Sequence, residues 1–328
     1  MKTIRKTGAV MLSLVAVVML LTARVSAGER TLIAAGTAFG VRFHTDGVVV
    51  AGIPADSGPA AEAGLKRGDV ITAINGERVR SAEHFADAVK RSLGQEIALE
   101  YRRGEETCTA HVRAVTDESG EYRLGVWVKD SAAGIGTITF IDPETMQFVG
   151  LGHGICDAES GALIPLAGGS AEEVTLSGIT VGEAGVPGEL RGSFCGSKLG
   201  KLTKNLATGI YGVLLDVPSG LEKERFPIGS KDDVTEGKAY IFSTVDGEGR
   251  AMYEIEISRV ERESDARNFI VKITDPRLLD KTGGIVQGMS GSPIIQNGKL
   301  VGAVTHVLVN DPARGYGIFI ENMLEAAA

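Results

Sequence analysis

Aromatic residues and cysteines are both scarce in this chain. Phe, Tyr and Trp together make up 5% of the 328 residues, which gives little material for a large aromatic substrate pocket. The three cysteines, Cys108, Cys156 and Cys195, are far apart and form no Cys-x-x-Cys pair, so a zinc ribbon is not indicated. We expect them to be small buried hydrophobic side chains. One disulfide and one free thiol is the alternative, if the chain lies outside the cytoplasm.

The chain also lacks the patterns of fibrous and disordered proteins. The 44 glycines and 10 prolines make up about a sixth of the residues, below the ~25–30% of low-complexity chains, and no Gly-x-y period is present. The apolar content of 43% is sufficient for a buried core. Glycine is nearly twice as frequent as the ~7% of an average chain, which favours many tight turns between short strands.

The first 27 residues have the features of an export signal. A basic start (Lys2, Arg5 and Lys6) precedes the uncharged, mostly apolar run 8–23, and Val25 and Ala27 occupy the −3 and −1 positions of a cleavage site. The run is shorter than a comfortable membrane span, although an uncleaved anchor at residues 8–23 remains the alternative. Without residues 1–27 the charged residues number 30 basic and 42 acidic, so the exported chain is acidic. Nucleic acid is therefore not expected as a partner.

Residues 36–115 are predicted to form one compact α+β module. Short alternating runs indicate strands, Asn75-Gly76 indicates a tight turn, and Ser81 is placed to cap a helix that ends at Gly94. A shorter helix is expected at residues 59–63. The order of these motifs resembles a PDZ domain, and the matching segments are Ala38-Phe39-Gly40-Val41, residues 58–65, Gly68-Asp69-Val70-Ile71 and Ile74-Asn75-Gly76.

That resemblance implies a peptide-binding groove. Phe39, Gly40 and Val41 would offer backbone N–H groups to a peptide carboxylate, and the peptide would add as a strand beside the following segment. The occupant would be the C-terminus of another protein or part of this chain. His84 lies where some PDZ domains contact a ligand hydroxyl, but an ordinary solvated helix residue is the simpler interpretation.

Residues 116–123 are polar and are expected to be a linker, and residues 124–328 form the second domain. Repeated short β-prone runs separated by glycine and charged turns favour an all-β sandwich or a pair of barrels.

The strongest chemical signal in that domain is Gly288-Met289-Ser290-Gly291-Ser292-Pro293. A serine between glycines can expose its hydroxyl on a sharp turn, and the N–H groups of Gly288 and Ser290 can converge as an oxyanion hole. The turn is followed by a predicted hairpin through Asn297-Gly298. This order resembles the chymotrypsin-like serine proteases, although Ser292 stands where their signature has glycine. A glycine-serine turn without chemistry is the alternative.

A nucleophilic serine needs a base. His153 is flanked by glycines after an apolar run and precedes Ser290, in the order of the chymotrypsin-like fold. His306, on the predicted hairpin strand after Ser290, is the alternative base. It could equally line the pocket or belong to the core.

Residues 124–328 closely resemble the SpoIVB peptidases. The matching segments are Gly152-His153-Gly154-Ile155, Gly288-Met289-Ser290-Gly291-Ser292-Pro293, and residues 302–312 continuing to Gly315-Tyr316-Gly317-Ile318. The order of signal or anchor, PDZ domain and then a chymotrypsin-like double β-barrel also matches that family. HtrA proteases place the PDZ domain after the protease.

The resemblance implies a triad, in which His153 is the general base, Ser290 the nucleophile and Asp275 the acid. An acid must orient the histidine and stabilise its imidazolium. Asp275-Pro276 could instead be an ordinary turn, and Asp216 and Asp246 are the competing acids. No metal or organic cofactor is required.

The resemblance further implies a signalling protease of the sporulating cell. Such enzymes cut themselves and then the extracytoplasmic part of a membrane regulator, which releases an intramembrane protease that matures a late sigma factor. About ten residues separate the expected cleavage site from the PDZ-like module, a short segment for self-cleavage. The alternatives are a non-catalytic PDZ-containing scaffold of the envelope and a general quality-control protease.

Overall fold

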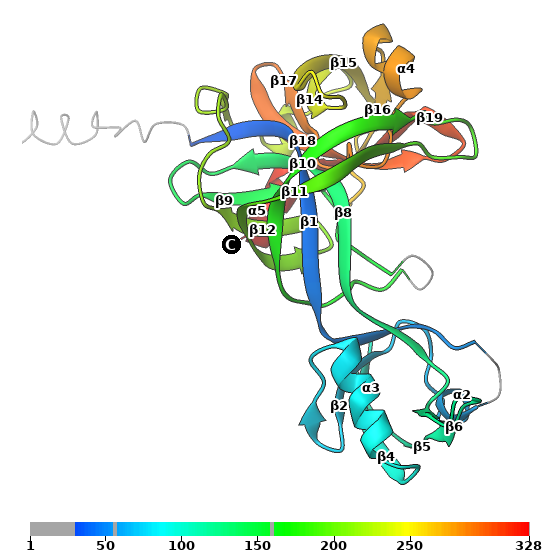
Figure 1. The fold of residues 1–328 in the computed structure, drawn as a ribbon. Coiled ribbons are helices and arrows are strands. Elements are labelled where there is room, and N and C mark those ends of the chain that lie inside the picture. Colours follow the sequence, from blue (N-terminus) through cyan, green and yellow to red (C-terminus); the bar gives the residue numbers. More distant parts are fainter. Residues whose placement is uncertain (1–29, 55–57, 158–160, 328) are drawn as a thin grey trace, which may run out of the picture. The chain divides into compact units, whose positions relative to one another are not determined.

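The computed structural model describes residues 30–54, 58–157 and 161–327 (Figure 1). The predicted export signal at residues 1–27, with its apolar run 8–23, lies outside these residues. No helix within the described ranges is long and apolar enough to cross a membrane.

Six strands of the peptidase-like part close into a first barrel. Consecutive antiparallel pairings join β1 to β8, β8 to β9, β9 to β12, β12 to β11, β11 to β10, and β10 back to β1. The barrel core contains fully buried side chains such as Phe39 and Phe148, whose rings meet edge to face with centroids 5.8 Å apart. The strands are β1 (Thr31–Gly52), β8 (Trp127–Ile141), β9 (Gln147–Gly150), β10 (Leu166–Thr180), β11 (Glu189–Leu206) and β12 (Gly209–Leu214).

A second closed barrel has the strand order β14-β15-β16-β19-β18-β17. The predicted hairpin after the Ser290 turn is present, since β17 and β18 meet through Asn297 and Gly298, both with positive φ. The strands are β14 (Gly237–Thr244), β15 (Arg250–Ser258), β16 (Phe269–Ile273), β17 (Pro293–Gln296), β18 (Lys299–Leu308) and β19 (Asp311–Phe319). The helices are α4 (Pro276–Thr282) and α5 (Ile320–Ala327), preceded by β13 (Arg225–Pro227) and the short helix η1 (Lys231–Asp233).

The chain between β1 and β8 forms the α+β module. Its main helix begins as predicted, because the Ser81 hydroxyl accepts a hydrogen bond from the His84 N–H at 3.0 Å. Phe85 and Val89 of that helix are buried against the strands. The elements are α2 (Pro59–Glu62), β2 (Val70–Ile74), β3 (Glu77–Arg78), α3 (Ala82–Arg91), β4 (Glu96–Arg103), β5 (Glu106–Arg113), β6 (Val115–Thr116) and β7 (Tyr122–Arg123).

The predicted mainly-β architecture of two barrels and a PDZ-like module is therefore confirmed, but the predicted boundaries of 36–115, 116–123 and 124–328 are not those of the structure. Most of the long strand β1 belongs to the first barrel, where residues 37–44 pair with β8. The core of the PDZ-like module in turn includes Leu124, with Val126 and Val128 packed against it. The module is thus an insertion between two adjacent strands of the barrel, because long-range strand pairing decides the boundary. The expected linker contains the two-stranded β6–β7 ladder.

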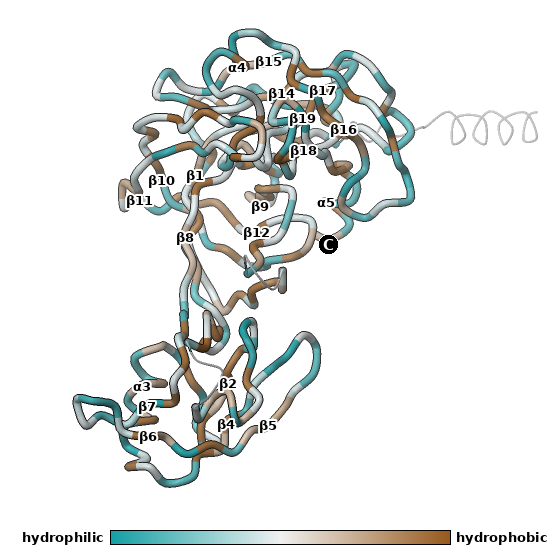
Figure 2. The backbone as a smooth tube through the Cα atoms, turned by 90° about the vertical axis from the view of Figure 1, so that its right-hand side faces the viewer, coloured by the Kyte–Doolittle hydropathy of each residue, from teal (hydrophilic) through white to brown (hydrophobic). Residues whose placement is uncertain are grey.

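Hydrophobic segments of the chain in Figure 2 lie in the cores, whereas many of the outer turns are hydrophilic. The cysteines depart from the expectation of burial. All three are free thiols, and Cys156 and Cys195 are exposed while Cys108 is half-buried.

Candidate active site

Ser290 lies on a tight turn that only glycine neighbours can form. Gly288 and Gly291 have φ values of 101° and 96°, in the region that favours glycine. A Cβ on Gly291 would lie 2.1 Å from the carbonyl oxygen of Thr137. The glycines predicted around the nucleophile are therefore required by the backbone.

His153, in the loop after β9, lines the same pocket as Ser290. Its Nδ1 lies 2.9 Å from the carbonyl oxygen of Gly154. A carbonyl can only accept, so Nδ1 carries the proton and the neutral ring keeps the lone pair of Nε2 free for a proton from a nucleophile. Burial lowers the pKa of His153 below 6.5, which keeps the ring neutral at pH 7.

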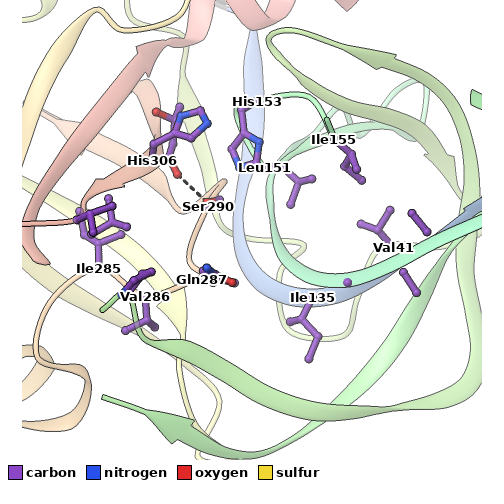
Figure 3. A pocket seen from close by; sticks show the side chains of 18 residues that line it. Val41, Ile135, Leu151, His153, Ile155, Ile285, Val286, Gln287, Ser290 and His306 are labelled. Carbon is purple, nitrogen blue, oxygen red and sulfur yellow. Dashed lines mark hydrogen bonds between the residues drawn. The ribbon is translucent and has the colours of Figure 1, made fainter. Parts of the chain in front are cut away.

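His306 stacks beside His153, with ring centroids 4.4 Å apart. Figure 3 shows both rings next to Ser290. Loss of hydration, the neighbouring His153 and the charge of Arg267 lower the pKa of His306 to about 4. Both predicted base candidates are therefore at the site, and both are neutral near pH 7.

The Ser290 hydroxyl donates to the carbonyl oxygen of Thr305 at 2.6 Å, drawn as a dashed line in Figure 3. Attack on a substrate requires this hydroxyl to turn to a base. Such catalytic contacts commonly form only with substrate bound.

The N–H groups predicted to form the oxyanion hole are available to a substrate. Within the described residues, the N–H groups of Gly288 and Ser290 donate to no protein atom, whereas those of Met289, Gly291 and Ser292 donate to backbone carbonyls. Both Gly288 and Ser290 line the pocket. The arrangement can stabilise a developing oxyanion.

Asp275 is not at this site. Its carboxylate caps α4 by accepting from the Arg277 N–H at 3.0 Å, forms an ion pair with the Arg277 guanidinium at 2.7 Å, and accepts from the Glu254 N–H at 3.2 Å. These contacts lower its pKa to about 2. The prediction that Asp275 orients His153 is therefore not met, because its carboxylate is engaged at the helix terminus and the Gly154 carbonyl holds the ring.

The competing acids are also engaged elsewhere. Asp216 is exposed and accepts from the Val217 N–H, and Asp246 pairs with Lys281. The described residues that line the pocket include no carboxylate.

The pocket beside Ser290 has a volume of about 540 Å³ and a largely aliphatic lining (Figure 3). Among the residues that the structure describes, no aromatic side chain other than the two histidines lines it, so the scarcity of aromatics did not preclude an apolar pocket. The aliphatic lining residues include Val41, Ile135, Leu151, Ile155, Ile285 and Val286.

The prediction that Phe39, Gly40 and Val41 bind a peptide is wrong. Phe39, Gly40 and Val41 lie in β1 with β8 paired on one side, and Gly40 and Val41 also pair with β10 on the other. Phe39 and Val41 are buried in the barrel core. Their backbone N–H groups therefore cannot receive a peptide.

A second apolar-Gly-apolar segment, Leu124-Gly125-Val126, holds the position expected of a carboxylate-binding loop. It precedes β8, and Gly125 has a φ of 69°. With α3 it borders a pocket of about 460 Å³. The same motif that pointed to Phe39–Val41 could have identified it. His84, at the start of α3, contacts Glu77 and does not line this pocket.

Family models match both domains. A model described as SpoIVB peptidase S55 matches residues 120–324, and a PDZ domain model matches residues 54–103.

Similarity to individual curated proteins is partial. Regulator of sigma-W protease RasP of Bacillus subtilis (strain 168) is 44% identical over 66 residues, which are 20% of this chain and 16% of that protein. A DegP-like periplasmic serine endoprotease of Brucella suis biovar 1 (strain 1330) is 35% identical over 106 residues, 32% of this chain and 19% of that protein. The chain thus spans a fifth or less of the first curated relatives that it matches.

Solved structures match in parts as well. The PDZ domain of an SdrC-like protein from Listeria monocytogenes is 29% identical, with a TM-score of 0.24, and the match covers 25% of this chain and 87% of that one. The HtrA-type protease AlgW with decapeptide is 12% identical, with a TM-score of 0.34, covering 60% and 52% of the two chains.

Proposed function

Because the chain belongs to the SpoIVB peptidase family and is a serine peptidase, we propose that it is an exported signalling endopeptidase that uses Ser290 as nucleophile and His153 as base. The observation that carries the assignment is the convergence of Ser290, His153 and two unengaged N–H groups in one pocket. The hydroxyl attacks a peptide carbonyl, His153 takes its proton, and the N–H groups of Gly288 and Ser290 stabilise the oxyanion.

Active-site labelling tests this assignment. A peptidyl phosphonate should attach covalently to Ser290 of the wild-type protein, as read by mass spectrometry of the intact chain. Ser290→Ala should remain unlabelled and inactive while keeping its unfolding transition. Ser193→Ala is the control, since that serine is exposed on β11 and does not line the pocket. Labelling of the Ser290→Ala protein at the wild-type rate would remove Ser290 from the mechanism and favour the non-catalytic scaffold.

The pocket supports a preference for an aliphatic residue at the scissile bond. Its lining next to Ser290 is apolar and, within the described part of the chain, contains no carboxylate that would pair with a basic side chain. Peptides that differ only at this residue should be cleaved fastest with Leu or Val and slowest with Lys or Asp. A faster rate with Lys would contradict the assignment of this pocket to the scissile residue.

The PDZ groove is proposed to lie between α3 and Leu124–Val128, where it would receive the apolar C-terminus of a protein. The segment Leu124-Gly125-Val126, which lies between β7 and β8 and lines the pocket, supports this, as does the apolar wall formed by Phe85 and Val89 of α3. Ala86→Glu would place a carboxylate in the groove and should abolish binding of a fluorescent peptide with a free C-terminus. Val115→Glu, on an exposed strand outside the groove, is the control.

The membrane regulator of an intramembrane protease remains the proposed substrate, and self-cleavage remains proposed with it. Family membership is the support for both. A signalling enzyme should cut a purified extracytoplasmic regulator domain at few sites and leave unfolded casein largely intact. Broad degradation of casein would favour a quality-control protease. Sequencing of the N-terminus from membranes and supernatant tests the export signal at residues 1–27 and the anchor at residues 8–23.

A further inference from the structure

The carbonyl groups of residues 287–290 in the nucleophile turn all accept hydrogen bonds from the protein. The Gln287 carbonyl accepts from the Leu190 N–H at 2.8 Å. The Met289 carbonyl accepts from the hydroxyl of Ser292 at 2.7 Å. The other two carbonyls, those of Gly288 and Ser290, are both held by Thr137.

Thr137 is a fully buried residue of β8 in the first barrel. Its hydroxyl donates to the Gly288 carbonyl at 2.7 Å, and its N–H donates to the Ser290 carbonyl at 3.0 Å. Its own carbonyl accepts from the Leu151 N–H at 3.1 Å, two residues before His153. One residue therefore connects the nucleophile turn to the strand end that precedes the base.

The contacts of Thr137 hold the 288–289 and 290–291 peptide planes. These two planes lie on either side of the 289–290 plane, which carries the Ser290 N–H, and the first of them adjoins the 287–288 plane, which carries the Gly288 N–H and whose carbonyl is held by Leu190. The plane of each trans peptide is rigid, so a held carbonyl also fixes the N–H of the following residue. Gly288 has a φ of 101°, a conformation that few residues adopt and that the surroundings must maintain. Without the Thr137 hydroxyl, the Gly288 carbonyl would be buried without its partner, and the turn could relax by rotating that peptide.

We propose that Thr137 is a positioning residue: it holds the peptide planes adjoining those that carry the Gly288 and Ser290 N–H groups, and through the backbone of the turn keeps both groups in the geometry of the oxyanion hole. This inference rests on the proposed role of Ser290. Thr137 does not line the pocket and acts through the turn, so its contribution is made in the transition state, when charge develops on the substrate oxygen.

The test compares Thr137→Val, which removes the hydroxyl and keeps the shape, with Thr137→Ser, which restores it. Thr139→Val is the matched control, because the Thr139 hydroxyl is equally buried two residues along β8 and has no hydrogen-bond partner among the described residues. The readouts are the rate of phosphonate labelling at Ser290 and kcat and KM for a fluorogenic peptide with Leu at the scissile bond.

Removing one oxyanion-hole donor costs about 10²–10³ in kcat. We therefore expect Thr137→Val, which leaves the donors present but poorly held, to lower kcat and the labelling rate about ten- to a hundredfold with KM within about threefold. Thr137→Ser should stay within about threefold of wild type and Thr139→Val should match it. Affinity for a peptide aldehyde, which forms an oxyanion on binding, should fall by the same factor as kcat. Affinity of the cleaved product peptide should not change.

Equal labelling of Thr137→Val and wild type would overturn the positioning role. So would a change confined to KM, or a loss that Thr139→Val shares. If Thr137→Val does not fold, Thr137→Ala is measured in its place against the same Ser variant. Failure of the Ser290 assignment is distinguishable, because it would appear as labelling of Ser290→Ala, whatever the Thr137 variants do.

Discussion

The imidazole of His306 stacks on that of His153, with the ring planes inclined by 33° and the centroids 4.4 Å apart. Two imidazoles at this distance repel each other when both are protonated, and His153 is among the causes that lower the pKa of His306. His153 alone has Nδ1 fixed by a carbonyl within the described residues, which leaves its Nε2 ready to accept a proton. This asymmetry favours His153 as the base.

Substitution of each histidine tests that assignment. His153→Gln should reduce the rate of phosphonate labelling at least a hundredfold, because general-base catalysis contributes about 10²–10⁴. His306→Gln should stay within about tenfold of wild type, since it removes a pocket wall and leaves the base. The reverse ranking in two folded variants would assign the base to His306.

The pH dependence of the reaction should follow His153. Its pKa is lowered below 6.5 by burial, and only the neutral ring can accept a proton. The labelling rate should therefore be constant through neutral pH and fall as the pH drops below 6.5. Burial lowers the pKa of His153 and the charge of His306 is not among the causes, so His306→Gln should leave the position of this fall unchanged. A fall that begins above pH 6.5 would contradict the burial of the base.

Asp275 should behave as a structural residue. Its carboxylate has a pKa of about 2, below the 3.8 of an unperturbed aspartate, so its ion pair with Arg277 stabilises the fold above pH 4 and is lost as the pH falls from about 4 to 2. Asp275→Asn should lower the free energy of unfolding at pH 7 by about 1–3 kcal/mol, measured with urea. Most of the labelling rate of the folded fraction should remain.

The control for this prediction is Asp216→Asn at an exposed position, which should change neither quantity. Loss of a triad acid costs about 10⁴ in kcat. A loss of that size in folded Asp275→Asn would restore Asp275 as the acid and require a conformation in which it reaches His153.

The parts of the site that the sequence predicts correctly are local. Gly288, Ser290 and Gly291 specify a turn by themselves, because the required φ values select glycine in any context. Asp275 followed by Pro276 carries an equally local signal, that of a helix N-terminus, and this interpretation is the one found in the structure. Its assignment to the triad depended on contacts between segments that are distant in the chain, and such contacts cannot be predicted from the local pattern of one sequence.

The misplaced peptide-binding loop has a similar cause. Phe39-Gly40-Val41 and Leu124-Gly125-Val126 share a pattern, and their difference lies in which strands pair with them. β1 continues in one direction through the barrel and into the PDZ-like module, so no turn or change in composition marks the boundary between the two. Thr137 could not have been found by pattern, since its partners are 151 and 153 residues away.

Strand β8 provides a physical link between the proposed groove and the active site. Val128 lines the groove, residues 132–135 of the same strand line the pocket of Ser290, and Thr137 holds the nucleophile turn. Gly134 pairs with Val41 of β1 and lines the pocket, and among the described residues an added Cβ there would meet no atom within 4 Å. A peptide that pairs with the start of β8 should restrict the motion of the strand and thereby favour the ordered pocket.

We therefore expect a saturating peptide with a free apolar C-terminus to raise kcat for a small fluorogenic substrate about two- to tenfold, since ordering the pocket removes an entropic cost from the catalytic step. The same peptide as a C-terminal amide should have little effect, because it lacks the carboxylate that the loop would bind. Ala86→Glu should abolish the activation and keep the basal rate, whereas Val115→Glu should keep both. If fluorescence shows that the peptide is bound in the groove while kcat is unchanged, the groove only recruits substrates. Binding there would then have no effect on the active site through β8.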